Sequence, residues 1–154
     1  MILRQLADNH MLHAVLTAWF LAQFLKVPME YLLNHNLNWG LWFSSGGMPS
    51  SHSALVTAAM ISVGLYYGFD SPSFAVAVAL AMVVVYDATG VRRQAGIQAQ
   101  RINTLISELL MGHPISEERL KEVLGHTPRQ VVAGVVLGTV ISIAFWLIWP
   151  PAGL

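Results

Sequence analysis

Two short segments carry side chains suited to phosphate chemistry, and each lies where a hydrophobic stretch begins. The first, GGMPSSHSA over residues 46–54, presents Ser50, Ser51 and His52 after a Gly-Gly pair, and the second, GHTPRQVVAG, contains His126. The N-terminus of a helix offers backbone N–H groups that bind phosphate. Two histidines can divide the roles of nucleophile and general acid. The two segments therefore indicate phosphate binding or phosphate transfer.

Cationic side chains lie near both segments. Lys26 lies within the first hydrophobic stretch, and Arg92 and Arg93 follow the third. Arg binds phosphate oxygens bidentately and Lys acts as a point charge, so these three are candidates for holding a phosphoryl group. Asp87, near the end of the third stretch, is the acid that precedes the two arginines.

Structural roles are open to the same residues. Lys26 can extend toward the membrane interface, the two arginines can anchor a span, and Asp87 can pair with Arg92. Ser50 or Ser51 can cap the helix that follows. The two histidines can pack in the core against backbone partners. Sequence chemistry alone leaves these alternatives beside the phosphate-binding ones.

The composition defines the environment in which these residues act. Of 154 residues, 55% are hydrophobic and only 10% are charged, whereas a soluble domain has about 25% charged residues. The 8 basic residues balance 8 acidic ones, which leaves no basic excess for nucleic acid, and cysteine is absent. This excludes a soluble globular enzyme, a disordered chain and a thiolate metal site. We expect one integral membrane domain over residues 1–154, with no metal or cofactor.

Four hydrophobic stretches are predicted to cross the membrane, because a spanning helix needs about 20 mostly apolar residues. They cover approximately residues 11–33, 53–69, 74–90 and 131–149. Ser71 and Pro72 are suited to the cap and first turn of the third. The sequence therefore predicts an all-α membrane protein with about four transmembrane helices.

The loop between the first two spans, residues 34–51, is rich in Asn, Gly and Ser and also contains Trp39, Trp42 and Phe43. Aromatic residues of this kind concentrate at membrane interfaces. We expect a re-entrant or interfacial loop here, in which the Gly46-Gly47 pair lets the backbone bend toward a ligand.

The second long connection, residues 91–126, is the main polar stretch. Apolar residues at helical spacing predict an amphipathic helix over residues 94–111, and a second short helix is expected over residues 116–124. Six of the 8 basic residues lie in or beside residues 91–129, which the positive-inside rule assigns to the cytoplasm. The candidate site residues then share the cytoplasmic face, and both termini lie outside.

The segments at residues 46–54, 87–103 and 125–134 resemble, in this order, the type 2 phosphatidic acid phosphatase and vanadium haloperoxidase superfamily. They are most similar to its divergent branch of small bacterial and plastid membrane proteins, over about residues 26–138. The superfamily has a Pro-Ser-Gly-His segment and a later His-x-x-x-Asp segment. Here Ser51 replaces the Gly and Gln130 replaces the Asp.

The resemblance implies a role for each candidate residue. It implies that His126 attacks phosphorus to form a phosphohistidine and that His52 protonates the leaving alkoxide. Gln130 is then the residue that orients His126, and Asp87 is a second candidate for the missing carboxylate. The phosphate-binding residues implied are Lys26, Ser50, Ser51, Arg92 and Arg93. The superfamily's Lys-x6-Arg-Pro spacing is absent, and Leu120 stands where its other Arg is found.

Two functions follow as hypotheses. The leading one is a metal-independent phosphatase acting on a lipid phosphate through a phosphohistidine intermediate. The alternative is a non-hydrolysing membrane protein that binds a phosphate-bearing lipid or a partner protein. Because four spans are few for this superfamily, a homodimer is a candidate assembly. We expect a bacterial cell membrane, with a thylakoid or plastid membrane as the alternative, and an active face on the cytoplasmic side.

Overall fold

The computed structural model describes residues 1–44, 46–109 and 125–151, and of residues 91–93, 108 and 109 the backbone only. These residues form helices and no strands. The elements in order are α1 (Ile2–Ala7), α2 (His10–Asn34), η1 (Trp39–Phe43), α3 (Ser51–Tyr67), α4 (Pro72–Thr89), α5 (Val91–Leu109) and α6 (Pro128–Ile148). The all-α prediction is confirmed.

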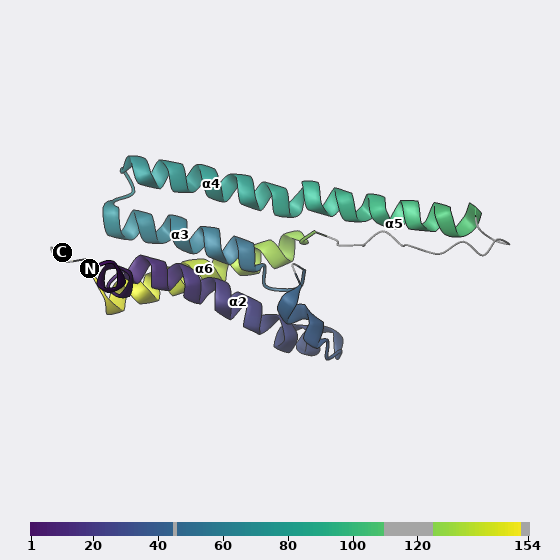
Figure 1. Ribbon diagram of the computed structural model, residues 1–154, viewed down its shortest axis with the longest axis horizontal. Helices are drawn as coiled ribbons and strands as arrows, with labels where there is room; N and C mark the ends of the chain where they lie inside the picture. The colour runs from purple at the N-terminus through teal and green to yellow at the C-terminus, as the bar shows by residue number, and fades with distance from the viewer. Residues whose placement is uncertain (45, 110–124, 152–154) are drawn as a thin grey trace.

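The long helices α2, α3, α4 and α6 form a bundle with α3 at its centre, in contact with the other three (Figure 1). Helices α2 and α4 run in one direction, and α3 and α6 run in the opposite direction. The start of α2 and the end of α6 lie at one end of the bundle. The other end gathers η1, the start of α3, the end of α4 and the start of α6. The topology therefore places every candidate site segment at one end.

Within the described residues, three helical stretches are long and apolar enough to cross a membrane: His10–Asn34, Pro72–Ser107 and Pro128–Ile148. The remaining expected span, α3, has 17 residues, which is at the short end of the usual range of roughly 17–25. Each of the four long helices starts within three residues of the predicted position. The short helix α1 was not predicted, because its 6 residues are too few to show a periodic pattern.

The helix ends follow from local side chains. Ser50 is the N-cap of α3, and its side chain accepts a hydrogen bond from the Ser53 N–H. Ser71 caps α4 in the same way, with Pro72 in the first turn. Gly68 ends α3 with a φ of +94°, a conformation that glycine adopts readily. The expected cap of α4 is confirmed, and of the two serines considered for α3 the cap is Ser50.

The bundle core is built from small residues, which lets the helix backbones approach closely. Ala14, Ala18 and Ala22 are fully buried along one face of α2. On α6, a Cβ added to Gly134 would collide with the Ser50 carbonyl oxygen, and one added to Gly138 would lie 2.5 Å from that of Ala54. Small residues at helix contacts are typical of membrane proteins, in which the large apolar side chains face lipid.

Only Gly90 separates α4 from α5, and α5 continues beyond the end of the bundle (Figure 1). The amphipathic helix predicted for residues 94–111 is therefore present as Val91–Leu109. The short helix predicted over residues 116–124 lies outside the described residues.

Candidate functional site

The two motif-bearing segments meet where α3 and α6 begin, a region that we call the α3–α6 corner and define by Ser50, Ser51, His126, Gln130 and Gly134. The Ser50 backbone N–H donates to the Gln130 carbonyl oxygen at 2.9 Å. Gly134, one turn further along α6, lies directly against the backbone of Ser50. Segments about 80 positions apart in sequence are thus joined backbone to backbone.

His126 is held on both sides. Its side chain is buried, with only 4% of the residue exposed, and its backbone N–H donates to the carbonyl of Ala88 in α4 at 3.1 Å. Its ring atom Nδ1 lies 3.2 Å from Gln130 Oε1. These contacts fix the position of His126 relative to α4 and α6.

The same Gln130 oxygen accepts a hydrogen bond from the Thr127 N–H at 2.9 Å. A backbone N–H requires an acceptor, so the amide oxygen, not the amide nitrogen, faces this group. A hydrogen bond between His126 Nδ1 and this oxygen therefore requires the tautomer that carries the proton on Nδ1. In that tautomer the lone pair lies on Nε2, the nitrogen suited to attack phosphorus.

The serines of the first segment lie at the buried start of α3. Ser50 and Ser51 are both buried, and Ser50 Oγ accepts from the Ser53 N–H at 3.3 Å and lies 3.0 Å from Ser53 Oγ. His52 follows in the first turn, with an exposed side chain. The structure thus places His52 and His126 at the same end of the bundle but in different surroundings.

Lys26 is fully buried and does not extend to the surface of the chain. Its ammonium donates to the Ser44 carbonyl oxygen at 2.7 Å. Its aliphatic part packs on Gly47, where an added Cβ would lie 3.3 Å from Lys26 Cδ, and Gly47 has a φ of +89°. Lys26 is therefore directed into the loop that carries the Gly-Gly-Met-Pro-Ser-Ser-His segment.

The remaining candidates lie at the junction of α4 and α5. Asp87 is half-buried in the last turn of α4, next to Ala88, and lines a pocket of about 700 Å³ with residues of α4. Arg92 and Arg93 lie in the first turn of α5, and their side chains are outside the described part of the structure. The pairing of Asp87 with Arg92 stays a prediction.

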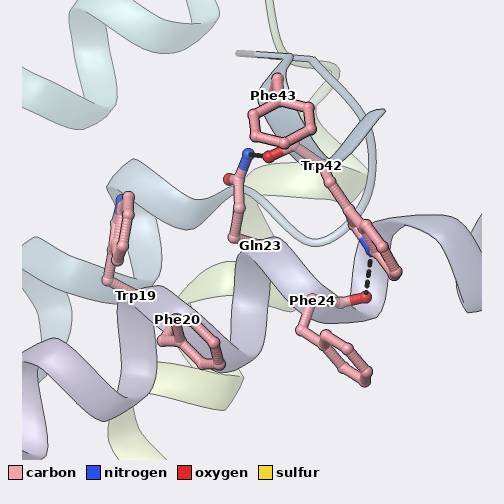
Figure 2. A pocket seen from close by; sticks show the side chains of 6 residues that line it. All are labelled: Trp19, Phe20, Gln23, Phe24, Trp42 and Phe43. Carbon is pink, nitrogen blue, oxygen red and sulfur yellow. Dashed lines mark hydrogen bonds between the residues drawn. The ribbon is translucent and has the colours of Figure 1, made fainter. Parts of the chain in front are cut away.

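A second cluster was not anticipated from the sequence and centres on Gln23, a polar residue within the first hydrophobic stretch. Its side-chain amide donates to the Trp42 carbonyl at 2.6 Å and to that of Ser44 at 3.2 Å. Trp42 Nε1 in turn donates to the Phe24 carbonyl at 3.2 Å (Figure 2). These bonds fasten η1 to α2. The available signal was the spacing of Gln23 and Lys26, which lie three residues apart on one helix face.

The described residues contain no group of three or more His, Asp or Glu side chains that would hold a metal ion. What the corner offers instead is a buried, oriented histidine, a helix start and a buried ammonium nearby. Helix starts of this kind bind anions through backbone N–H groups and the helix dipole.

Comparisons with known proteins agree with the resemblance seen in the motifs. The sequence model of the Divergent PAP2 family matches residues 7–141. The uncharacterized membrane protein YuiD of Bacillus subtilis is 39% identical over 150 residues, covering 90% of this chain and 95% of the relative. No solved structure matches the chain.

Proposed function

The chain belongs to the Divergent PAP2 family, and on that premise we propose that it acts on a lipid phosphate through a phosphohistidine intermediate. The observation that carries the proposal is the contact of His126 Nδ1 with Gln130 Oε1 at 3.2 Å, at the start of α6. This contact leaves the nucleophilic lone pair on Nε2 and holds the ring in one orientation.

In the proposed reaction, His126 Nε2 attacks phosphorus and forms a P–N bond. The P–O bond to the lipid alkoxide breaks, and His52 supplies the proton that converts the alkoxide into a neutral alcohol. Water then attacks the phosphohistidine, the P–N bond breaks, and inorganic phosphate is released. His52 takes a proton from that water, so both histidines return to their starting states.

Binding of the phosphoryl oxygens is proposed for Lys26, Ser50, Ser51, Arg92 and Arg93. The burial of Lys26 supports this role, because an ammonium taken out of water is stabilised chiefly by an anion. Its bond to the Ser44 carbonyl uses one of three N–H donors, which leaves two for phosphate oxygens. The N–H groups at the start of α3 add further donors.

The membrane setting supports a lipid substrate. The candidate residues collect at one end of a bundle of apolar helices, where a lipid head group would lie. We place this end on the cytoplasmic side of a bacterial cell membrane, because six of the 8 basic residues lie in or beside residues 91–129. A homodimer remains the proposed assembly if a second copy is needed to enclose the site.

Gln130 favours a second candidate function, a protein that binds a lipid phosphate without hydrolysing it. A Gln carbonyl orients His126, but it carries no charge to stabilise the imidazolium that forms on attack. In a serine protease, the comparable change of the histidine-orienting Asp to Asn lowers turnover by about 10⁴. Asp87 is the proposed alternative source of the carboxylate, on the neighbouring helix α4.

Phosphate release by the purified protein separates the two functions. The substrates would be phosphatidic acid, phosphatidylglycerol phosphate and a polyprenyl pyrophosphate in detergent micelles. We expect release from at least one lipid, and a loss of about a thousandfold or more in His126→Ala. Equal release by wild type and His126→Ala rejects hydrolysis. Retained binding of the lipid phosphate in both proteins then supports the non-hydrolysing function.

A further inference from the structure

The outer face of α2 carries an aromatic pocket that has no role in the proposed phosphate chemistry. This aromatic pocket has a volume of about 560 Å³ and is lined by Trp19, Phe20, Gln23, Phe24, Trp42 and Phe43. Figure 2 shows the rings arranged around the Gln23 amide, with Phe20 and Phe24 on α2 and Phe43 on the overlying η1. A volume of this size is typical of small-molecule sites.

The walls of the aromatic pocket are held in place rather than collapsed together. Trp42 stacks on Phe24 with ring centroids 5.6 Å apart, and its indole N–H donates to the Phe24 carbonyl. The side-chain amide of Gln23 holds the backbone of η1 by donating a hydrogen bond to the Trp42 carbonyl. Other rings stay open to the outside, since Phe20 is 62% and Phe43 is 93% exposed. On a membrane helix such surfaces meet hydrocarbon, not water.

The polar end of the aromatic pocket adjoins the proposed phosphate site through a shared atom. Gln23, which lines the pocket, and Lys26 both donate to the carbonyl oxygen of Ser44. A buried cation therefore lies directly beside an apolar, aromatic hollow. The complementary ligand has an anionic group joined to a hydrocarbon chain.

The aromatic pocket extends from Lys26 along α2 in the direction that a lipid chain takes from its head group into the bilayer. Trp19 lies seven residues before Lys26 on α2, which corresponds to about 10 Å along the helix axis. That displacement runs from the end of the bundle that carries the site toward its middle. A lipid chain leaves its head group along the same path into the bilayer.

We propose that the aromatic pocket holds the upper part of one hydrocarbon chain of the lipid whose phosphate lies beside Lys26, so that the protein selects long-chain lipid phosphates over short-chain or soluble ones. This inference rests on the proposed function for the phosphate end. It adds a chain-binding subsite on α2 and η1, separate from the histidines.

The test uses the purified full-length protein in detergent and two phosphatidic acids, one with oleoyl chains and one with hexanoyl chains. Binding is measured by native mass spectrometry. We expect Phe43→Ala to weaken binding of the oleoyl lipid about tenfold, since a wall of the pocket is lost, and to weaken binding of the hexanoyl lipid less, since its shorter chain fills less of the pocket. Tyr67→Ala, an exposed aromatic at the far end of α3, should change neither.

A photoreactive phosphatidic acid with a diazirine high in one chain locates the occupant directly. Adducts should map to residues 19–24 and 39–43, and excess dioleoyl phosphatidic acid should suppress them while phosphatidylcholine does not. Equal suppression by phosphatidylcholine identifies a groove for any membrane lipid and overturns the inference. Tight, chain-independent binding with adducts elsewhere overturns it while the proposed function stands. No binding of either phosphatidic acid by wild type overturns both.

Discussion

The α3–α6 corner and the aromatic pocket lie at the same end of the bundle, yet they are built by opposite means. The corner is assembled by backbone contacts, with the Ser50 N–H bound to the Gln130 carbonyl and Gly134 pressed against Ser50. The pocket is assembled by side chains, with Gln23 and Trp42 tying η1 to α2. One is closely packed around buried side chains, and the other is open on its outer side.

This difference indicates that the two regions meet different requirements. A nucleophile must be held within a fraction of an ångström, which backbone contacts between rigid helices achieve. A hydrocarbon chain requires only a shaped apolar surface, which a loop held by side-chain hydrogen bonds can supply. Lys26 contacts the loop that connects the two regions, because its ammonium donates to the Ser44 carbonyl and its stem packs on Gly47. Substitutions in each region should therefore have different kinds of effect.

The largest effect is expected at the corner, for Gly134→Ala. The added Cβ would collide with the Ser50 carbonyl and would lie 3.0 Å from Ser53 Cβ, so α3 and α6 would have to move apart. We expect a loss of about 3 kcal/mol in stability, at the upper end of the usual cost of overpacking. Thermal unfolding in detergent measures it.

Gly46→Ala is the matched control, because its Cβ would meet only Ser44 Oγ at 3.6 Å, an ordinary contact. Equal stability losses in the two variants would show that backbone packing at the corner is not special.

The next largest effect is expected for Lys26→Met, which removes the charge and keeps an unbranched apolar stem. The affinity for phosphatidic acid should fall by about 10- to 100-fold, the loss expected for hydrogen bonds to a charged group. Stability without ligand should be unchanged or higher, because a buried charge costs desolvation free energy. Lipid binding and thermal unfolding, measured on the same sample, test the predicted loss of affinity and the predicted unchanged or higher stability.

Gln23→Met serves as the comparison for Lys26→Met. It also loses a hydrogen bond to the Ser44 carbonyl but changes no charge, so it should lower stability and spare the affinity of the phosphate end. If Lys26→Met behaves like Gln23→Met in both measurements, Lys26 is only a tether for the loop.

A smaller effect, of opposite sign, is expected for Gln130→Glu. The change keeps the side-chain length that spans the contacts to His126 and Thr127, and it adds a negative charge beside the imidazolium and the start of α6. Turnover should rise about tenfold for each 1.4 kcal/mol of transition-state stabilisation gained.

The gain in Gln130→Glu should vanish in a His126→Ala background, because the two groups act as one unit. If Asp87 already supplies the carboxylate, Gln130→Glu should be neutral or harmful, and Asp87→Asn should abolish phosphate release. Phosphate release from phosphatidic acid distinguishes these results.

The smallest effect is expected in the aromatic pocket, for Trp42→Phe. A ring that can stack on Phe24 is retained, while the hydrogen bond to the Phe24 carbonyl and part of the indole ring are lost, so stability should fall by about 0.5–1.5 kcal/mol. Trp39→Phe, which keeps a ring in the edge contact with Trp42, is the control and should change less. An equal loss in both would assign the effect to ring size, not to the hydrogen bond.

The membrane class, the helices and most of their ends could be predicted from the sequence alone. Apolar length, caps such as Ser71 and stops such as Gly68 are local features, and local features are decided by neighbouring residues in the chain. The three motif segments also identified the family, because their order and residue types are specific. The prediction missed α1, whose 6 residues show no periodic pattern.

Which groups meet depends instead on the tertiary structure. Ser50 joins Gln130 because Gly134 lets two backbones approach, and Lys26 turns to Ser44 because the loop folds back along α2. Gln23, a polar residue within an expected span, anchors η1 to α2, and two of the three aromatic residues of the loop, Trp42 and Phe43, line a pocket. Such contacts join residues about 20 to 80 positions apart, so they depend on the packing of whole helices, which no single stretch of sequence encodes.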